Sequence, residues 1–398
     1  IKDKNIFLLY SILPIALIIG SAVLNSLILL INFFFIYEIY RSKKFDFFNN
    51  KFFFILLFIW IFQLFNSIII ASNIDSFIRS FGFLRFLLLI FSIKFYFDRD
   101  ENFKNLVLGF WFVIFSIVTV DILKEFFTGT NILSFKSNYN GRIASFTGSE
   151  LKIGGYYFGF ILLSLSFFYV NFYKKYQSIF FILIFVFMIT SFFIGERSNF
   201  IKVFFICSFF IIFLKKQNLI KKLLTLTFFI SICLLTIVNN QFFKSRLVTE
   251  IIVPIKQMGI SAFINDSKYG KHYEIAKNIY LDNKIFGVGI KNFRNTSVYP
   301  KYNKNDNLEG SSTHPHQIHY EFLSETGTIG YFVFITFFIY SVILGFKNFH
   351  KNRNPYMLSA SLFLIATAIP LIPSGSFFTS YGASIFWINF SFLTLNDK

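Results

Sequence analysis

The sequence predicts an all-α, polytopic integral membrane protein. Its 398 residues are 55% hydrophobic and only 15% charged, whereas a soluble domain usually carries about 25% charged residues. Apolar stretches near the ~20 residues that a helix needs to cross a bilayer recur along the whole chain. These stretches are continuous and do not alternate between apolar and polar residues, so membrane-spanning strands are disfavoured.

We predict about twelve membrane-spanning helices and one large polar segment between the ninth and the tenth. The chain then divides into spans one to nine (1–239), a large periplasmic loop (240–327) and spans ten to twelve (328–398). The expected spans are 6–20, 22–40, 52–72, 80–97, 105–124, 153–172, 178–194, 199–214, 222–239, 328–346, 356–373 and 376–394.

Basic residues give this arrangement an orientation. Every short basic loop follows an even-numbered span, as Lys174 and Lys175 follow the sixth and Arg353 follows the tenth. Because lysine and arginine accumulate in short cytoplasmic loops, both termini are predicted inside and the segment 240–327 outside. The net charge of +18 therefore indicates membrane orientation and no nucleic-acid partner.

Several classes of chemistry lack their motifs in this sequence. The chain has no P-loop, no dinucleotide-binding fingerprint and no paired-cysteine metal motif. Cys207 and Cys233 both lie in apolar stretches, which is typical of small core residues. An ATP-driven cytoplasmic enzyme is thus disfavoured, and a reaction outside must use a substrate that arrives already activated, without a cofactor.

The polar stretch "SSTHPHQIHYEFLSETGTIGY" contains three of the five histidines, His314, His316 and His319. Pro315 suits the first turn of a helix, which would place His316 near a helix N-terminus. There the helix dipole favours a neutral imidazole, able to accept a proton, and favours a phosphate nearby. The alternatives are histidines that are solvated or hydrogen-bonded, and a zinc site. The zinc site is disfavoured because neither cysteine nor an H-E-x-x-H spacing supports it.

Two arginines are also expected on the outer face. Arg142 lies in the loop before the sixth span, and Arg197 lies in the short loop between the seventh and eighth spans. Paired N–H groups of arginine suit phosphate oxygens. A lone arginine at a span end is more often a lipid-headgroup anchor, and Glu196 could pair with Arg197.

A second part of the large loop carries His272 and Arg294 around the turn Gly287-Val288-Gly289. Tyr273, Ala276 and Tyr280 form an apolar stripe beside His272 at helical spacing. The alternative interpretation is an amphipathic helix that rests on the membrane surface.

These motifs resemble the O-antigen ligase and O-antigen polymerase superfamily of bacterial envelope glycosyltransferases. His316-Gln317, nine residues and then Gly327-Thr328-Ile329-Gly330 match a pattern at the end of that family's large periplasmic loop, with Glu325 in its usual place. The turn at Gly287–Phe293, Arg142-Ile143 and Arg197 are also similar to the family. One departure is that no arginine stands in the loop just ahead of the glycine turn, where Lys268, Lys271 and His272 occur instead.

The resemblance implies a GT-C-like glycosyltransferase in the bacterial inner membrane with its active site facing the periplasm. The donor would be a glycan on undecaprenyl pyrophosphate, and the acceptor a sugar hydroxyl of lipid A–core. His316 would be the general base; Arg197 and Arg142 would bind the pyrophosphate, and His272, Arg294 and His314 would assist without a metal ion.

Four other functions stay open at this point. An O-antigen or polysaccharide polymerase, which uses a lipid-linked repeat as acceptor, shares these motifs, and a protein O-oligosaccharyltransferase shares the architecture. A secondary transporter or flippase is disfavoured because Asp121, Arg85 and Lys202 lie toward span ends and the two halves show no repeat. The fourth is a non-catalytic envelope scaffold.

Overall fold

The computed structural model describes residues 4–139, 141–148, 150–214, 219–303 and 311–396, and all regular elements in these ranges are helices. This confirms the predicted all-α class. The first half comprises α1 (Lys4–Ser11), α2 (Leu13–Ile19), α3 (Ser21–Ser42), α4 (Lys51–Phe65), α5 (Ile74–Gly82), α6 (Leu84–Arg99), α7 (Glu101–Thr128), α8 (Ile153–Phe172), α9 (Gln177–Phe193) and α10 (Arg197–Phe213). The second half comprises α11 (Leu219–Asn239), α12 (Gln241–Lys244), α13 (Val253–Asp266), α14 (Lys268–Asp282), α15 (Phe293–Thr296), α16 (Ile318–Asn352), α17 (Pro355–Thr367) and α18 (Ser380–Ser391).

Eight helical stretches in the described ranges are long and apolar enough to cross a membrane. They make the chain a multi-pass membrane protein. Most coincide with expected spans, whereas the expected spans 6–20, 178–194, 199–214, 356–373 and 376–394 correspond to helices of 17 residues or fewer. The number twelve therefore stays a prediction.

Short polar residues start many of these helices. The side chains of Asn50, Asn73 and Asp100 accept hydrogen bonds from backbone N–H groups in the first turns of α4, α5 and α7. Such caps satisfy donors that have no partner inside the helix. Asn354 and Pro355 begin α17 in the same way.

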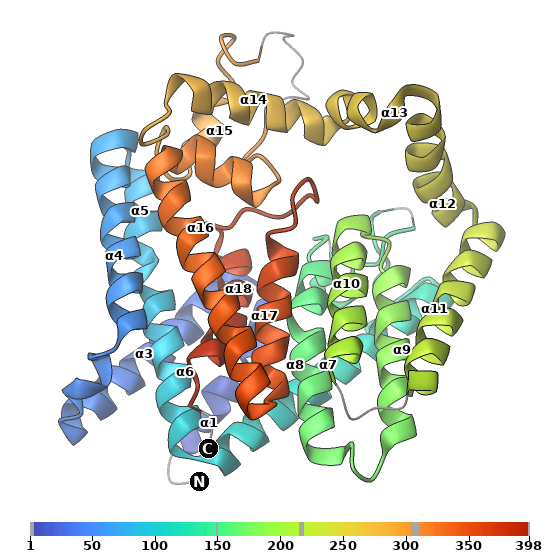
Figure 1. The fold of residues 1–398 in the computed structure, drawn as a ribbon, viewed down its shortest axis with the longest axis horizontal. Coiled ribbons are helices and arrows are strands. Elements are labelled where there is room, and N and C mark those ends of the chain that lie inside the picture. Colours follow the sequence, from blue (N-terminus) through green and yellow to red (C-terminus); the bar gives the residue numbers. More distant parts are fainter. Residues whose placement is uncertain (1–3, 140, 149, 215–218, 304–310, 397–398) are drawn as a thin grey trace.

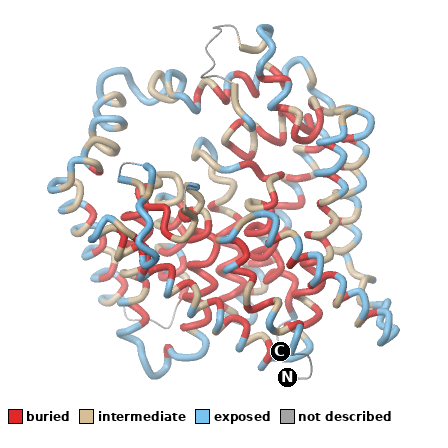
Figure 2. The backbone as a smooth tube through the Cα atoms, turned by 180° about the vertical axis from the view of Figure 1, so that it is seen from behind, coloured by how far each residue is buried: buried red, intermediate tan, exposed pale blue. Residues whose placement is uncertain are grey.

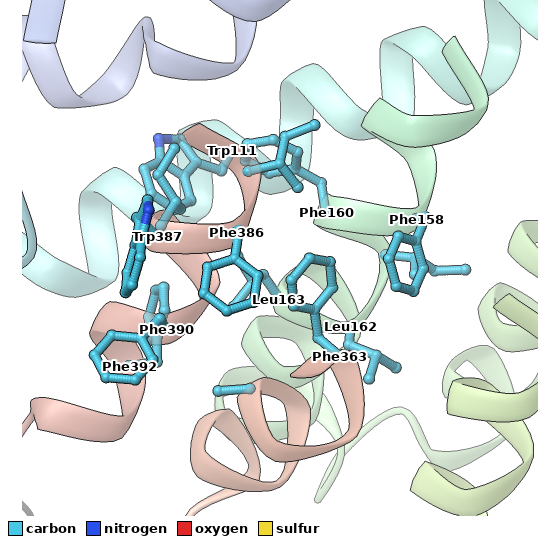
Figure 3. Close-up of a cluster of buried hydrophobic side chains, with 14 of the residues drawn as sticks. Trp111, Phe158, Phe160, Leu162, Leu163, Phe363, Phe386, Trp387, Phe390 and Phe392 are labelled. Atoms are coloured by element: carbon cyan, nitrogen blue, oxygen red, sulfur yellow. The ribbon is translucent and has the colours of Figure 1, made fainter. Parts of the chain in front are cut away.

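Aromatic side chains fill the centre of the bundle. Trp111 of α7 and Phe160 of α8 pack edge to face with ring centres 5.6 Å apart. Phe386 of α18 lies beside Phe363 of α17, and Trp387 packs against Phe386 (Figure 3). Seen from behind, buried residues concentrate in this bundle, while the helices around residues 219–266 are largely exposed (Figure 2). The buried core therefore lies in the bundle.

The segment expected as the large loop is mostly helical. It contains α12, a π-helix at Ser245–Ile252, α13, α14 and α15. In Figure 1 these helices lie across the end of the bundle opposite both termini. The stretch Gln241–Asp266 itself meets the length and composition of a membrane span, although α13 crosses the bundle end instead of running along it.

Candidate active site

The histidine stretch is folded differently from the prediction at its helix start. α16 begins at Ile318, and Gln317 caps it by accepting hydrogen bonds from the N–H groups of His319 and Tyr320. The helix start predicted at Pro315 is therefore wrong, because the Gln317 side chain supplies the cap. His316 precedes the helix in a left-handed conformation with φ 59°, and its carbonyl accepts a 2.7 Å hydrogen bond from the N–H of Ser374.

Three of the predicted histidines lie together. The ring centre of His316 is 4.0 Å from that of His314 and 5.2 Å from that of His272 in α14. Burial lowers the pKa of His316 to about 3, with further lowering from the charges of His314, His272 and Lys268. Burial and the nearby charge of Lys291 lower the pKa of His314 to about 4. Both rings are therefore neutral at pH 7, as expected of a proton acceptor.

The two glycine motifs pack against each other and hold this histidine stretch in place. The N–H of Val288 donates to the backbone carbonyl of Ser324 at 3.0 Å, and the N–H of Gly289 donates to the backbone carbonyl of Glu325 at 2.9 Å. Gly327 has φ 66°, and an added Cβ there would lie 2.4 Å from the carbonyl oxygen of Ile285. Glycine is thus required where the two turns cross.

Two buried glutamates of α16 extend this connection. The Glu325 carboxylate accepts the N–H of Lys291 at 2.8 Å, while Glu321 accepts the N–H of Phe377 at 2.8 Å and the hydroxyl of Ser376. The Nζ of Lys291 donates to the Ser376 hydroxyl at 2.5 Å. These side chains fix the segments on both sides of the histidine stretch.

Arg142 and Arg197 both lie near a third arginine, Arg246. The Nη1 of Arg197 donates to the backbone carbonyl of Arg246 at 2.8 Å and lies 3.2 Å from Glu250. The charge of Arg246 interacts with those of Arg142 and Arg197. We call Arg142, Arg197 and Arg246 the arginine cluster.

Buried carboxylates of α7 hold the loop that carries Arg142. Asp121 accepts the N–H of Ile132 at 2.6 Å and the hydroxyl of Ser145 at 2.5 Å. Glu125 accepts the N–H of Ser145 at 2.7 Å. The N–H of Ile143 also donates to the carbonyl of Ile194 at 3.1 Å, which brings this loop against the turn before Arg197.

Tyr269 lies between the histidines and the arginine cluster. Its ring centre is 5.5 Å from that of His316, and it interacts electrostatically with Arg246. Sequence reasoning did not single out Arg246 because it lies more than twenty residues ahead of the position where the missing arginine was sought. Its place just after the ninth expected span was the available signal.

Arg294 and His319 lie apart from the three histidines and the arginine cluster. Arg294 is exposed and reaches the group only through its charge, which acts on His314. The ring of His319 forms hydrogen bonds with the carbonyl of Ala368 through Nε2, at 2.8 Å, and with the hydroxyl of Tyr331 through Nδ1, at 3.1 Å. In the described ranges no three His, Cys, Asp or Glu side chains, these histidines included, are arranged so that they could hold a metal ion.

A cavity of about 750 Å³ opens beside His316. Its polar lining comes from α8, α10, the histidine stretch and the segment before α18. The lining residues include Lys152, Glu196, Asn199, Lys202, His314 and Ser374. Burial raises the pKa of Glu196, which lies between this cavity and Arg197. The cavity volume is in the range of small-molecule binding sites.

A comparison with protein families matches part of the chain. Residues 179–335, which include Arg197, Arg246, both glycine motifs and His316, match the family described as "O-Antigen ligase". No curated protein matches the chain. This match supports a relationship of the chain to the O-antigen ligase and polymerase superfamily, whose members are glycosyltransferase-like enzymes.

Proposed function

We propose that the protein transfers a glycan from undecaprenyl pyrophosphate to a sugar hydroxyl of lipid A–core, on the periplasmic face of the bacterial inner membrane. The observation that carries this proposal is the position of a neutral His316 at the cavity wall, connected through Tyr269 to the arginine cluster. His316 suits removal of a proton from the acceptor, and the arginine cluster suits binding of the donor's phosphates.

The arginine cluster is the proposed diphosphate site. As the bond between the sugar and the phosphate breaks, its electron pair passes to undecaprenyl pyrophosphate and negative charge grows on the phosphate oxygens. Guanidinium groups stabilise that charge with paired N–H contacts. Arg246 replaces the missing loop arginine in this proposal, in preference to His272 and Arg294. Three cations at the diphosphate make a divalent metal ion unnecessary.

His316 is the proposed general base. The acceptor oxygen forms its new bond to the anomeric carbon and passes its proton to the imidazole. General-base catalysis of this kind contributes about 10²–10⁴-fold. The Nε2 of His316 lies 3.1 Å from the hydroxyl of Ser312, and His272 and His314 surround the ring.

Transfer of glycan from a lipid-linked donor to lipid A–core by the purified protein in excess EDTA tests this proposal. The acceptor is tested separately by the lipopolysaccharide of a deletion strain. Core without repeats indicates a lost ligase, whereas core with a single repeat indicates a lost polymerase. Absence of transfer to any glycan or protein acceptor, together with substrate uptake into vesicles, would favour a transporter instead.

A further inference from the structure

A lysine buried in α10 stands out among the residues that line the cavity. Lys202 is 3% exposed, and among the described residues its Nζ donates one hydrogen bond, to the carbonyl of Pro373 at 3.3 Å. In the described part of the chain it forms no ion pair. A buried ammonium without a carboxylate has lost its hydration with little compensation. A ligand anion in the cavity would supply that compensation.

The other cations along the cavity differ from Lys202. Lys152 is ion-paired with Glu150, and Arg79 is exposed. Neither carries a buried charge that lacks an acidic partner. An anion inside the cavity would therefore gain most from Lys202.

Lys202 does not belong to the arginine cluster. Arg197 begins α10, and Lys202 follows five residues later, which is about 7.5 Å further along the helix and about 140° around it. Arg197 accordingly faces Arg246 and Glu250. Lys202 faces Pro373 and the ring of Phe158, whose centre lies 5.7 Å from Nζ. The two cations therefore serve different sides of the helix.

Neutral polar groups near Lys202 suit a sugar. The hydroxyl of Ser374 is buried without a hydrogen bond among the described residues, and the ring of His314 lies against the Ser374 backbone. Both residues line the cavity, as Asn199 does. Sugar hydroxyls both donate and accept hydrogen bonds, so they can satisfy such groups.

We propose that Lys202 forms an anion subsite, and that the glycan entering this cavity carries a carboxylate or phosphate on one of its sugars. The inference rests on the proposed function in taking the cavity ligand to be a glycan. The arginine cluster then binds the donor's diphosphate, and Lys202 binds the acid of a sugar residue.

The test measures binding to the full-length protein in detergent. The probes are methyl glucuronoside, glucose 6-phosphate and the neutral methyl glucoside, and binding is followed by the shift in melting temperature. We expect the affinity of at least one acidic probe to exceed that of the neutral probe by about tenfold or more, because a hydrogen bond to a charged group contributes that much. The acidic probe that binds identifies the acid as carboxylate or phosphate. Equal affinities for all three would overturn the proposal.

Two lysine variants make the test specific. Lys202→Met should abolish the preference for acidic probes, and Lys202→Arg should keep it. The matched control is Lys222→Met, because Lys222 is also buried and donates to a backbone carbonyl, that of Leu214 at 2.8 Å, but lies away from the cavity. Lys222→Met should leave the preference intact. A preference that survives Lys202→Met would refute the subsite. If Lys202→Met does not fold, the comparison of Lys202→Gln with Lys202→Arg decides.

Inorganic pyrophosphate separates this subsite from the diphosphate site. Arg197→Ala should weaken pyrophosphate binding, and Lys202→Met should leave it within about twofold. An equal loss in both variants would place Lys202 in the diphosphate site and overturn the proposal. Glycan transfer without acid-selective binding would refute the subsite alone, whereas acid-selective binding without any transfer would refute the proposed function alone.

Discussion

At the scale of single residues, the position of His316 is more informative than its chemical type. A left-handed backbone conformation is costly for a residue with a side chain, and it persists where the surroundings enforce it. Here the surrounding contacts are the hydrogen bond from Ser374 and the rings of His314 and His272. Such strain is common at functional sites, which fits the role proposed for this side chain.

His316→Ala should lower the rate of glycan transfer by about 10²–10⁴-fold, because the acceptor hydroxyl loses its proton acceptor. Binding of the diphosphate donor should stay within a few-fold of the original protein, since the arginine cluster is untouched. His350→Ala is the control, because His350 is exposed near the end of α16. Full activity of His316→Ala in a transfer assay would remove His316 from its proposed role.

The pH dependence of transfer should reflect the lowered pKa of His316, about 3 in the folded protein, compared with about 6.5 for an unperturbed histidine. The neutral, proton-accepting form is then lost only as the pH falls toward 3. We expect kcat/KM, which reports the free enzyme, to stay level between about pH 5 and pH 7. A decline centred near pH 6.5 would contradict this prediction.

At the scale of elements, the crossing of the two glycine turns positions the histidine stretch. Gly327→Ala should destabilise the protein, because the new Cβ meets the Ile285 carbonyl oxygen and the left-handed conformation costs about 1–3 kcal/mol. Gly129→Ala is the control for a positive φ without a close contact, since Gly129 has φ 80° with no atom within 4 Å of an added Cβ. The melting temperature of Gly327→Ala should be clearly lower than that of Gly129→Ala, and equal values would show that the close contact is unimportant.

The loop that carries Arg142 depends on the carboxylates of α7. Asp121→Ala removes the acceptor for Ile132 and Ser145, so Arg142 should lose its fixed position at the diphosphate. We expect KM for the lipid-linked donor to rise about tenfold, the equivalent of one charge-assisted hydrogen bond, with kcat changed less. Glu101→Gln, at the exposed start of the same helix, should leave both constants unchanged. A fall in kcat alone would assign Asp121 a different role.

At the scale of the whole molecule, the sequence named residues of the candidate site more readily than it predicted which residues contact one another. The apolar stretches predicted the helices of the bundle, and motif spacing identified His316, Arg142 and Arg197. Hydropathy could not show that 240–303 folds mostly into helices, because apolar and charged residues are mixed along these helices. Nor could it identify Arg246 or Lys291, since their contacts depend on helices far apart in the chain. The predicted start of α16, at Pro315, was wrong by a few residues, because the side chain of Gln317 caps the helix where serine, threonine, asparagine or aspartate is more usual.

The orientation of the molecule in the membrane can be tested with single cysteines. Both termini and the connection between α8 and α9 lie at one end of the bundle, and α14 and α15 lie at the other (Figure 1). Because short basic loops stay in the cytoplasm, a cysteine at Asn295 in α15 should react with an impermeant maleimide in spheroplasts. One at Lys175 should react only after the membrane is permeabilised. Cys207 and Cys233 are buried, so they add little background. The opposite labelling pattern would place His316 in the cytoplasm, away from any donor in the outer leaflet, and the proposed reaction could not occur.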